Sequence, residues 1–368
     1  MPSLILCAIV GCEGGPEAKS PSSRSGVWSK LPSVRDAARN GLQELTAEKV
    51  GSTIIIVAGA SYRAARVGGL RYDLSARRWL RLRPAPLSWR ADYATAKVRN
   101  QIVIWGGTSD RGLLRDGASY ELATNRWRRL PSSPLRPRYG HTAVSTGRTL
   151  IFFGGATTPR LAGPSSNTGG TYTPGEEGWS RIPRAPIEGR RAHVAVWSGD
   201  EMIVWGGHAR ERGGVPQRFF SDGAAFDPKS NRWRRIARAP FRATDDSFGV
   251  WVGDALFVFD GMRAALYDPR SNAWTSAASP PNTGVAYGGV WNGKHILMWG
   301  PDSDTGVTSA AAYNPSRDVW VSLQSGPLSA RRNHVRLWTG KSLFLWGGCC
   351  TEDSEHSDGA EYHPPWRR

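Results

Sequence analysis

Cysteine is scarce in this chain, and its placement argues against a disulfide framework. Of the four cysteines in 368 residues, Cys7 and Cys12 lie near the N-terminus, and the other two are the adjacent Cys349 and Cys350. Adjacent cysteines can form only a strained bridge, so we interpret these two as small side chains beside a turn. No histidine stands beside them at metal-ligand spacing, and the sequence therefore predicts no metal site there.

Motifs that carry chemistry are also absent from the sequence. It contains no nucleophile motif, no phosphate-binding loop and no zinc signature, so it predicts no cofactor and favours a binding protein over an enzyme. Lysine is rare as well: seven of the 48 basic residues are lysine, so the net charge of +17 comes mainly from arginine. Such a charge attracts polyanions, although compositional bias is the simpler explanation for most of these arginines.

A repeated pattern organises the rest of the chain. An aromatic residue precedes a tryptophan, usually by seven positions, in seven pairs: Tyr72/Trp79, Tyr120/Trp127, Tyr172/Trp179, Phe226/Trp233, Tyr267/Trp274, Tyr313/Trp320 and the shorter Tyr362/Trp366. Ahead of each pair lies a short apolar run that mostly ends in glycine, such as Ile102 to Gly107. These runs are too short for helices and suit strands that are buried on both faces.

Turn signals divide each repeat into four antiparallel strands, which we call a, b, c and d. A pattern such as Trp197-Ser-Gly-Asp200 joins strands a and b, and Asp227-Pro228 starts the turn between strands c and d. A period near 50 residues with a glycine doublet, a tyrosine and a tryptophan resembles the kelch repeat, whose units are the blades of a β-propeller. The resemblance covers about residues 26 to 366 and implies an all-β, seven-bladed propeller.

The ends of the chain predict how the ring closes and where the domain begins. The segment around Trp28 matches a strand d but precedes the first full repeat, so we expect it to complete blade 7. We therefore assign residues 26–368 to the propeller and residues 1–25 to a signal-type segment with a flexible tether.

The N-terminal segment predicts export. Leu4 to Val10 is apolar but too short to span a bilayer, and Ile9-Val10-Gly11-Cys12 resembles a bacterial lipobox, which implies lipidation of Cys12. The missing basic residues before the apolar core depart from that pattern. We expect an extracytoplasmic protein, in the periplasm or at the cell surface, whose only membrane contact is a lipid anchor.

Four arginines occupy one slot of the repeat, three residues before a second slot that often holds histidine. They are Arg90, Arg138, Arg190 and Arg331, and the remaining blades have Gln43, Thr244 and Gly284 there. Because strand a is innermost in a propeller, these arginines are predicted to surround the channel mouth and to grip a carboxylate or phosphate. The alternative is that each arginine makes a separate hydrogen bond between blades.

The histidine slot contains His141, His193 and His334. Histidines related by propeller rotation lie in different blades, so we expect each to bond to the backbone of the adjacent blade rather than to share a metal. Galactose oxidase belongs to this fold class and holds copper through tyrosines and histidines, but nothing in this sequence specifies that set of ligands.

The loops between strands b and c differ in charge. Blade 4 is basic and aromatic, with Arg210, Arg212 and Phe219 as further candidates for ligand binding, whereas the loop of blade 7 is acidic from Glu352 to Asp358. The sequence thus favours an exported module that binds an acidic glycan or protein through this loop face. The alternative is a carbohydrate enzyme similar to kelch sialic-acid mutarotases, in which Glu211 moves protons. Nucleic-acid binding is not expected, because no recognised reading motif is present.

Overall fold

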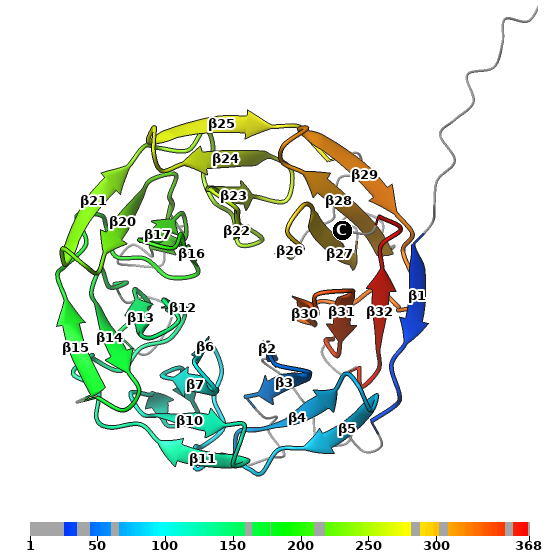
Figure 1. Ribbon diagram of the computed structural model, residues 1–368. Helices are drawn as coiled ribbons and strands as arrows, with labels where there is room; N and C mark the ends of the chain where they lie inside the picture. The colour runs from blue at the N-terminus through cyan, green and yellow to red at the C-terminus, as the bar shows by residue number, and fades with distance from the viewer. Residues whose placement is uncertain are drawn as a thin grey trace, which may run out of the picture.

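Seven four-stranded antiparallel sheets surround a central axis in the computed structural model (Figure 1). The structure describes residues 26–34, 45–59, 66–158, 164–176, 178–209, 218–280, 288–301, 308–349 and 356–366. Within these ranges there is no helix, and so none that is long and apolar enough to cross a membrane. The predicted all-β, seven-bladed propeller is confirmed.

Each blade uses its strands in the order a, b, c, d from the axis outward. Blades 1 and 2 consist of β2 (Thr46–Val50), β3 (Thr53–Ala58), β4 (Gly68–Asp73) and β5 (Arg78–Arg81), then β6 (Ala94–Val98), β7 (Gln101–Trp105), β10 (Gly117–Glu121) and β11 (Arg126–Arg129). Blades 3 and 4 consist of β12 (Thr142–Ser145), β13 (Leu150–Phe153), β14 (Gly169–Thr173) and β15 (Gly178–Ile182), then β16 (Val194–Trp197), β17 (Met202–Trp205), β20 (Gly223–Asp227) and β21 (Arg232–Ile236).

The second half of the ring repeats this order. Blades 5 and 6 consist of β22 (Phe248–Val252), β23 (Ala255–Phe259), β24 (Ala264–Asp268) and β25 (Ala273–Ala277), then β26 (Gly289–Trp291), β27 (Ile296–Pro301), β28 (Thr308–Asn314) and β29 (Val319–Leu323). Blade 7 consists of β30 (Val335–Trp338), β31 (Leu343–Trp346), β32 (Gly359–His363) and β1 (Val27–Lys30). Two short hairpins, β8 (Thr108–Ser109) with β9 (Gly112–Leu113) and β18 (His208–Ala209) with β19 (Arg218–Phe219), lie between strands b and c of blades 2 and 4.

The core lies between neighbouring blades. Strand b is buried along nearly its whole length, and alternate side chains of it pack against the blades on either side. One cluster joins Ile203 and Trp205 of blade 4 to Leu256 and Val258 of blade 5. This arrangement explains why the apolar runs in the sequence are continuous rather than alternating.

The outer strands form a belt around the circumference (Figure 1). The tryptophan of each outer strand packs on the aromatic residue opposite it in strand c, as Trp127 does on Tyr120 with ring centroids 5.1 Å apart. Its indole Nε1 donates to a backbone carbonyl that follows the preceding outer strand. The seven bonds are Trp79 to Pro32, Trp127 to Arg83, Trp179 to Pro131, Trp233 to Pro183, Trp274 to Ala237, Trp320 to Ala278 and Trp28 to Gln324. Each tryptophan therefore links its blade to the one before it.

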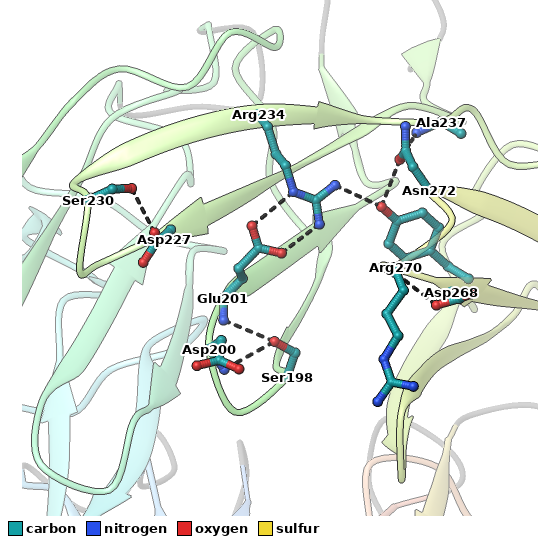
Figure 2. Close-up of polar contacts among 11 residues, drawn as sticks. Ser198, Asp200, Glu201, Asp227, Ser230, Arg234, Ala237, Asp268, Arg270 and Asn272 are labelled. Atoms are coloured by element: carbon teal, nitrogen blue, oxygen red, sulfur yellow. Dashed lines mark hydrogen bonds and ion pairs between the residues drawn. The ribbon is translucent and has the colours of Figure 1, made fainter.

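Polar side chains reinforce the junction between blades 4 and 5, as Figure 2 shows. Arg234 on β21 forms a two-point ion pair with Glu201, and its Nη1 also donates to the Tyr267 hydroxyl of blade 5 at 3.1 Å. The Asn272 Oδ1 accepts two hydrogen bonds, from the Tyr267 hydroxyl at 2.8 Å and from the Ala237 backbone N–H at 3.0 Å. The end of one outer strand is thereby attached to the turn that starts the next.

The ring closes through β1, as the sequence predicted. Strand β1 pairs with β32 in the register Trp28↔Tyr362, and the two rings lie 5.0 Å apart. Trp366, the second member of the shortened sequence pair, does not lie on an outer strand. Trp366 packs instead on His295 of blade 6, at 4.6 Å between ring centroids, because Trp28 already occupies the outer-strand position.

Candidate functional site

The four arginines of the repeated slot are buried inside the blades. Their exposed fractions are 0% for Arg90 and Arg190 and 1% for Arg138 and Arg331. Each lies in the connection that leads from strand d of one blade to strand a of the next. In this arrangement a ligand at the channel mouth would contact none of the four guanidinium groups.

The hydrogen bonds of Arg190 show what these side chains do. Its Nη1 donates to the carbonyl of Gly206 at 2.9 Å and of Asp222 at 3.1 Å, and its Nη2 donates to Asp222 Oδ1 at 2.8 Å. Arg90 repeats the pattern with Gly106 and Asp116. All these acceptors belong to the blade that the connection enters. The arginine therefore ties the connection to the b and c strands of the next blade.

The other blades vary this arrangement. Arg138 bonds the carbonyls of Gly154 and Thr168 and the Thr168 hydroxyl, while Arg331 binds the carboxylate of Asp358. Asp358 belongs to the acidic loop of blade 7, so part of that predicted acidic surface is used internally. In blade 5 the much shorter Thr244 takes the arginine slot and donates to the Asp260 carbonyl at 2.9 Å.

Burial dominates the electrostatics of these arginines. Loss of hydration lowers the pKa of Arg138 to about 10, with a further contribution from Arg181. Burial also lowers the pKa of Arg90 and Arg190, and Asp116 and Asp222 partly offset that effect. Removal of the partners of a buried guanidinium would leave an uncompensated charge and strongly destabilise the fold. These four residues are thus better explained as struts within the blades than as ligand contacts.

The histidines of the neighbouring slot contact the adjacent blade, but through aromatic rings and a side-chain hydroxyl. His141 lies edge-on to Trp105 and His334 edge-on to Trp299, each with ring centroids 5.0 Å apart. The Nε2 of His193 is 2.8 Å from the Thr142 hydroxyl of blade 3. Burial lowers the pKa of all three, to about 3 for His193, so they are neutral. Within the described ranges no three His, Cys, Asp or Glu residues are grouped to hold a metal ion.

A cavity of about 320 Å³ lies at blade 4 and includes one of the predicted ligand-binding residues, Phe219. Residues 218–222, which lead from the b–c loop into β20, form one wall, and Arg238 and Arg242, which follow β21, form the other. The first wall is held by backbone hydrogen bonds from Phe220 N–H to the Gly207 carbonyl and from Ala243 N–H to the Phe220 carbonyl. The cavity is therefore positioned by blade 4 and by its connection to blade 5.

The cavity carries excess positive charge. Arg218, Arg238 and Arg242 are all exposed. Arg218 forms an ion pair with Glu188, whereas neither Arg238 nor Arg242 forms an ion pair with any residue that the structure describes. The Asp222 carboxylate in the wall is bound by Arg190. Two guanidinium groups thus remain available for an acidic ligand.

Aromatic rings lie beside these charges, although Phe220 and Phe241 are buried. The guanidinium carbons of Arg190 and Arg218 lie 4.5 and 5.3 Å from the centroid of the Phe220 ring, and Phe219 packs near His208 at 5.5 Å. The Arg263 guanidinium of blade 5 lies 4.9 Å from the ring of Phe241, the residue that precedes Arg242. The site thus combines cations with apolar surface.

Several predicted residues lie outside the described ranges. They are Arg210, Glu211 and Arg212 in the blade 4 loop, and Cys12 at the N-terminus. Sequence reasoning missed Arg238 and Arg242, because they stand after a strand d rather than in a loop between b and c. A signal was present in the motif Arg-Ala-Pro-Phe-Arg at residues 238–242, but only the fold brings it opposite Phe219.

Comparisons with known proteins agree with the repeats seen in the structure. The family described as the KLHDC2/KLHL20/DRC7 Kelch-repeats domain matches residues 140–348, more than half of the chain. The chain is similar to Kelch-like protein 25 of Xenopus tropicalis, with 24% identity over 185 residues, which is 47% of this chain and 31% of that protein. It is also similar to a putative F-box/kelch-repeat protein of Arabidopsis thaliana, with 26% identity over 160 residues, 39% of this chain and 44% of the relative. The matched region spans less than half the length of either relative.

Proposed function

The chain belongs to the kelch-repeat family, and we propose that it is a protein-binding module whose blade 4 cavity takes an acidic segment of a partner. Kelch propellers are typically protein-interaction modules, which supports a protein as the partner. The observation that carries the proposal is the pair Arg238 and Arg242, two exposed arginines that line one cavity and form no ion pair with a described residue.

The chemistry of the cavity favours a carboxylate beside an apolar group. A guanidinium donates two parallel hydrogen bonds to a carboxylate, which makes arginine better suited than lysine to this recognition. A volume of about 320 Å³ accommodates one or two side chains rather than a folded surface. Phe219, which lines the cavity and is partly exposed, offers an apolar contact, so the expected ligand is a short acidic segment that contains an aromatic or aliphatic residue.

The test is a titration of fluorescent peptides that alternate Glu and Tyr, compared with matched peptides in which Gln replaces Glu. We expect only the acidic peptides to bind, and their affinity to fall as salt rises, because exposed charges are screened. Arg242→Ala and Arg238→Ala should each weaken binding by about 1.5 to 3 kcal/mol, the range for hydrogen bonds to charged groups.

Arg317→Ala is the matched control, because it removes the same charge from an exposed turn of blade 6, away from the cavity. It should leave peptide binding unchanged. The proposal fails if all three variants lose affinity equally, because the effect would then be one of net charge. An acidic oligosaccharide that outcompetes every acidic peptide would identify a glycan as the ligand instead.

We also propose that the protein is exported and attached to a membrane through lipidated Cys12. The support is the apolar run Leu4 to Val10, whose last two residues begin the lipobox-like Ile9 to Cys12. On expression in a bacterium, the protein should partition into membranes, and Cys12→Ser should release it or leave it uncleaved. An intact mass that shows unmodified Met1 in the cytosol would reject this proposal.

A further inference from the structure

The outer belt of the propeller is divided into a basic part and a neutral part. Strands β5, β11, β15 and β21 follow one another along the circumference over blades 1 to 4 (Figure 1). Together they expose eight arginines and contain no acidic residue: Arg78, Arg81, Arg126, Arg128, Arg129, Arg181, Arg232 and Arg235. We call this surface the arginine arc.

The outer strands of blades 5 and 6 lack these charges altogether. Strand β25 reads Ala-Trp-Thr-Ser-Ala and β29 reads Val-Trp-Val-Ser-Leu. Val319 and Val321 on β29 are 45% and 42% exposed at positions where the arc carries arginine. A general preference of this chain for arginine would place the residue on all outer strands alike. On the outer strands, arginine is confined to four consecutive blades, which indicates that this surface binds a ligand.

Most guanidinium groups of the arc form no close ion pair with a described residue. Among the eight, only Arg129 forms an ion pair with a described residue, Asp116, at 3.6 Å. Arg181 donates to the Pro134 carbonyl, which fixes its position without cancelling its charge. Strand c places Asp73, Glu121 and Asp227 opposite Arg78, Arg126 and Arg232, but none of these pairs forms a close ion pair. An anion along the rim would therefore meet exposed guanidinium groups.

We infer that the arginine arc binds a linear acidic polysaccharide that runs along the belt from blade 1 to blade 4. Outer strands that follow one another along a curved rim suit a flexible chain, which can follow the rim and contact several blades, whereas a flat membrane would meet only part of it. Carboxylate or sulfate groups along the chain would pair with successive guanidinium groups, and binding would gain from the number of contacts rather than from a deep pocket.

A single-stranded nucleic acid fits the arc less well. Proteins that bind such strands stack the bases on aromatic side chains. The tryptophans of the arc already pack on the aromatic residues of strand c, and their indole N–H groups donate to the preceding blade. The arc therefore supplies charge along the rim, while its aromatic rings serve the junctions between blades.

Heparin is the probe for the test, by column elution and by fluorescence titration at about 150 mM salt. The variant Arg126→Ser/Arg128→Ser/Arg129→Ser removes three charges from β11, and Arg232→Ser/Arg235→Ser removes two from β21. We expect each to weaken heparin binding at least about tenfold and to elute at lower salt, because fewer counterions are released on binding. All these side chains are exposed, so melting temperatures should stay close to that of the natural sequence.

The matched control removes three exposed charges outside the arc, in turns of blades 5 and 6. It combines Lys294→Ser, Arg270→Ser and Arg317→Ser. It should bind heparin as the natural sequence does, as should Arg242→Ala in the blade 4 cavity. Equal loss in this control and in the arc variants would overturn the inference, as would a failure of the natural sequence to bind heparin. Tighter binding of a single-stranded oligonucleotide of equal charge would overturn the choice of polysaccharide.

Discussion

At the scale of single residues, the buried histidines explain why the chain repeats a pair of glycines. A Cβ added to Gly154 would lie 2.5 Å from Cε1 of His193 in the next blade. A Cβ added to Gly207 would lie 2.7 Å from the Cβ of the same histidine. His193 thus fits between Gly154, the first glycine of the doublet in blade 3, and Gly207, the second glycine of the doublet in blade 4. The doublet marks the place where successive blades approach most closely.

The neutral state of these histidines predicts sensitivity to acid. His193 has a pKa near 3 in the folded protein and near 6.5 when unfolded, so below pH 6.5 the unfolded chain binds a proton that the folded chain does not. Stability is therefore complete above that pH and falls as the pH drops toward 3. His193 alone should cost about 2 kcal/mol between pH 6.5 and 4.5.

Urea unfolding at several pH values measures this effect. The variant His193→Gln removes the titrating group and should show a shallower loss of stability on acidification, by up to one proton. His141 and His334, whose pKa values burial also lowers well below 6.5, would keep part of the dependence. If the variant and the natural sequence have parallel pH profiles, His193 is protonated at the same pH in both states and the argument is wrong.

At the scale of elements, a residue in the turn between strands c and d attaches blades 5 and 6 to the blades before them. Asn272 has a left-handed φ of 51° and accepts from both Tyr267 and Ala237. Asp318 does the same in blade 6, where its Oδ1 accepts from the Tyr313 hydroxyl at 2.6 Å and from the Ala278 N–H at 2.7 Å. Asparagine and aspartate suit this place, because they tolerate left-handed backbone and carry a short acceptor.

Substitution of Asn272 tests the junction between blades 4 and 5. Asn272→Ala removes an acceptor shared by two hydrogen bonds, each worth about 1 kcal/mol, and strains the backbone, so we expect a loss of about 2 to 3 kcal/mol in unfolding free energy. Asn272→Asp should be tolerated, because Asp318 fills the same role in blade 6. A similar loss for both variants in urea unfolding would show that the side-chain acceptor is not what matters.

At the scale of the whole molecule, stability depends on closure of the ring. Every blade packs against two neighbours, and the seven tryptophan bonds form a complete circuit only because Trp28 reaches Gln324, almost 300 residues later in the sequence. Leu31 adds a backbone hydrogen bond to Gly359 at 2.9 Å. The N-terminal strand thus covers the edge that β32 would otherwise expose.

Two truncations separate this strand from the segment before it. Deletion of residues 1–32 removes β1 and the Trp28 contact with Tyr362, and should cost on the order of 3–5 kcal/mol or more. Deletion of residues 1–24 keeps β1 and should change stability little. Equal melting temperatures for the two truncated proteins would contradict closure by β1.

The sequence by itself determined the number of blades, the four strands of each and the strand that closes the ring. These features depend on local patterns, namely a glycine-ended apolar run, a turn signal and a tryptophan, and hydrogen bonding between adjacent strands follows from them directly. The loop of blade 4 was also recognisable as basic and aromatic from its residues, and Phe219 does line the cavity there.

Only the tertiary structure decided which arginines meet solvent. Arg190 and Arg242 are the same residue type, yet one is enclosed by acceptors 16 and 32 residues away and the other lies open beside a cavity. Repetition in sequence singled out the first kind, because a structural strut recurs in every blade that needs it. The cavity belongs to one blade, so no periodic pattern marks it. The arginines of the arc flank the repeated tryptophans, but their places on one continuous rim depend on the fold. They exist because folding brings separate segments onto one surface.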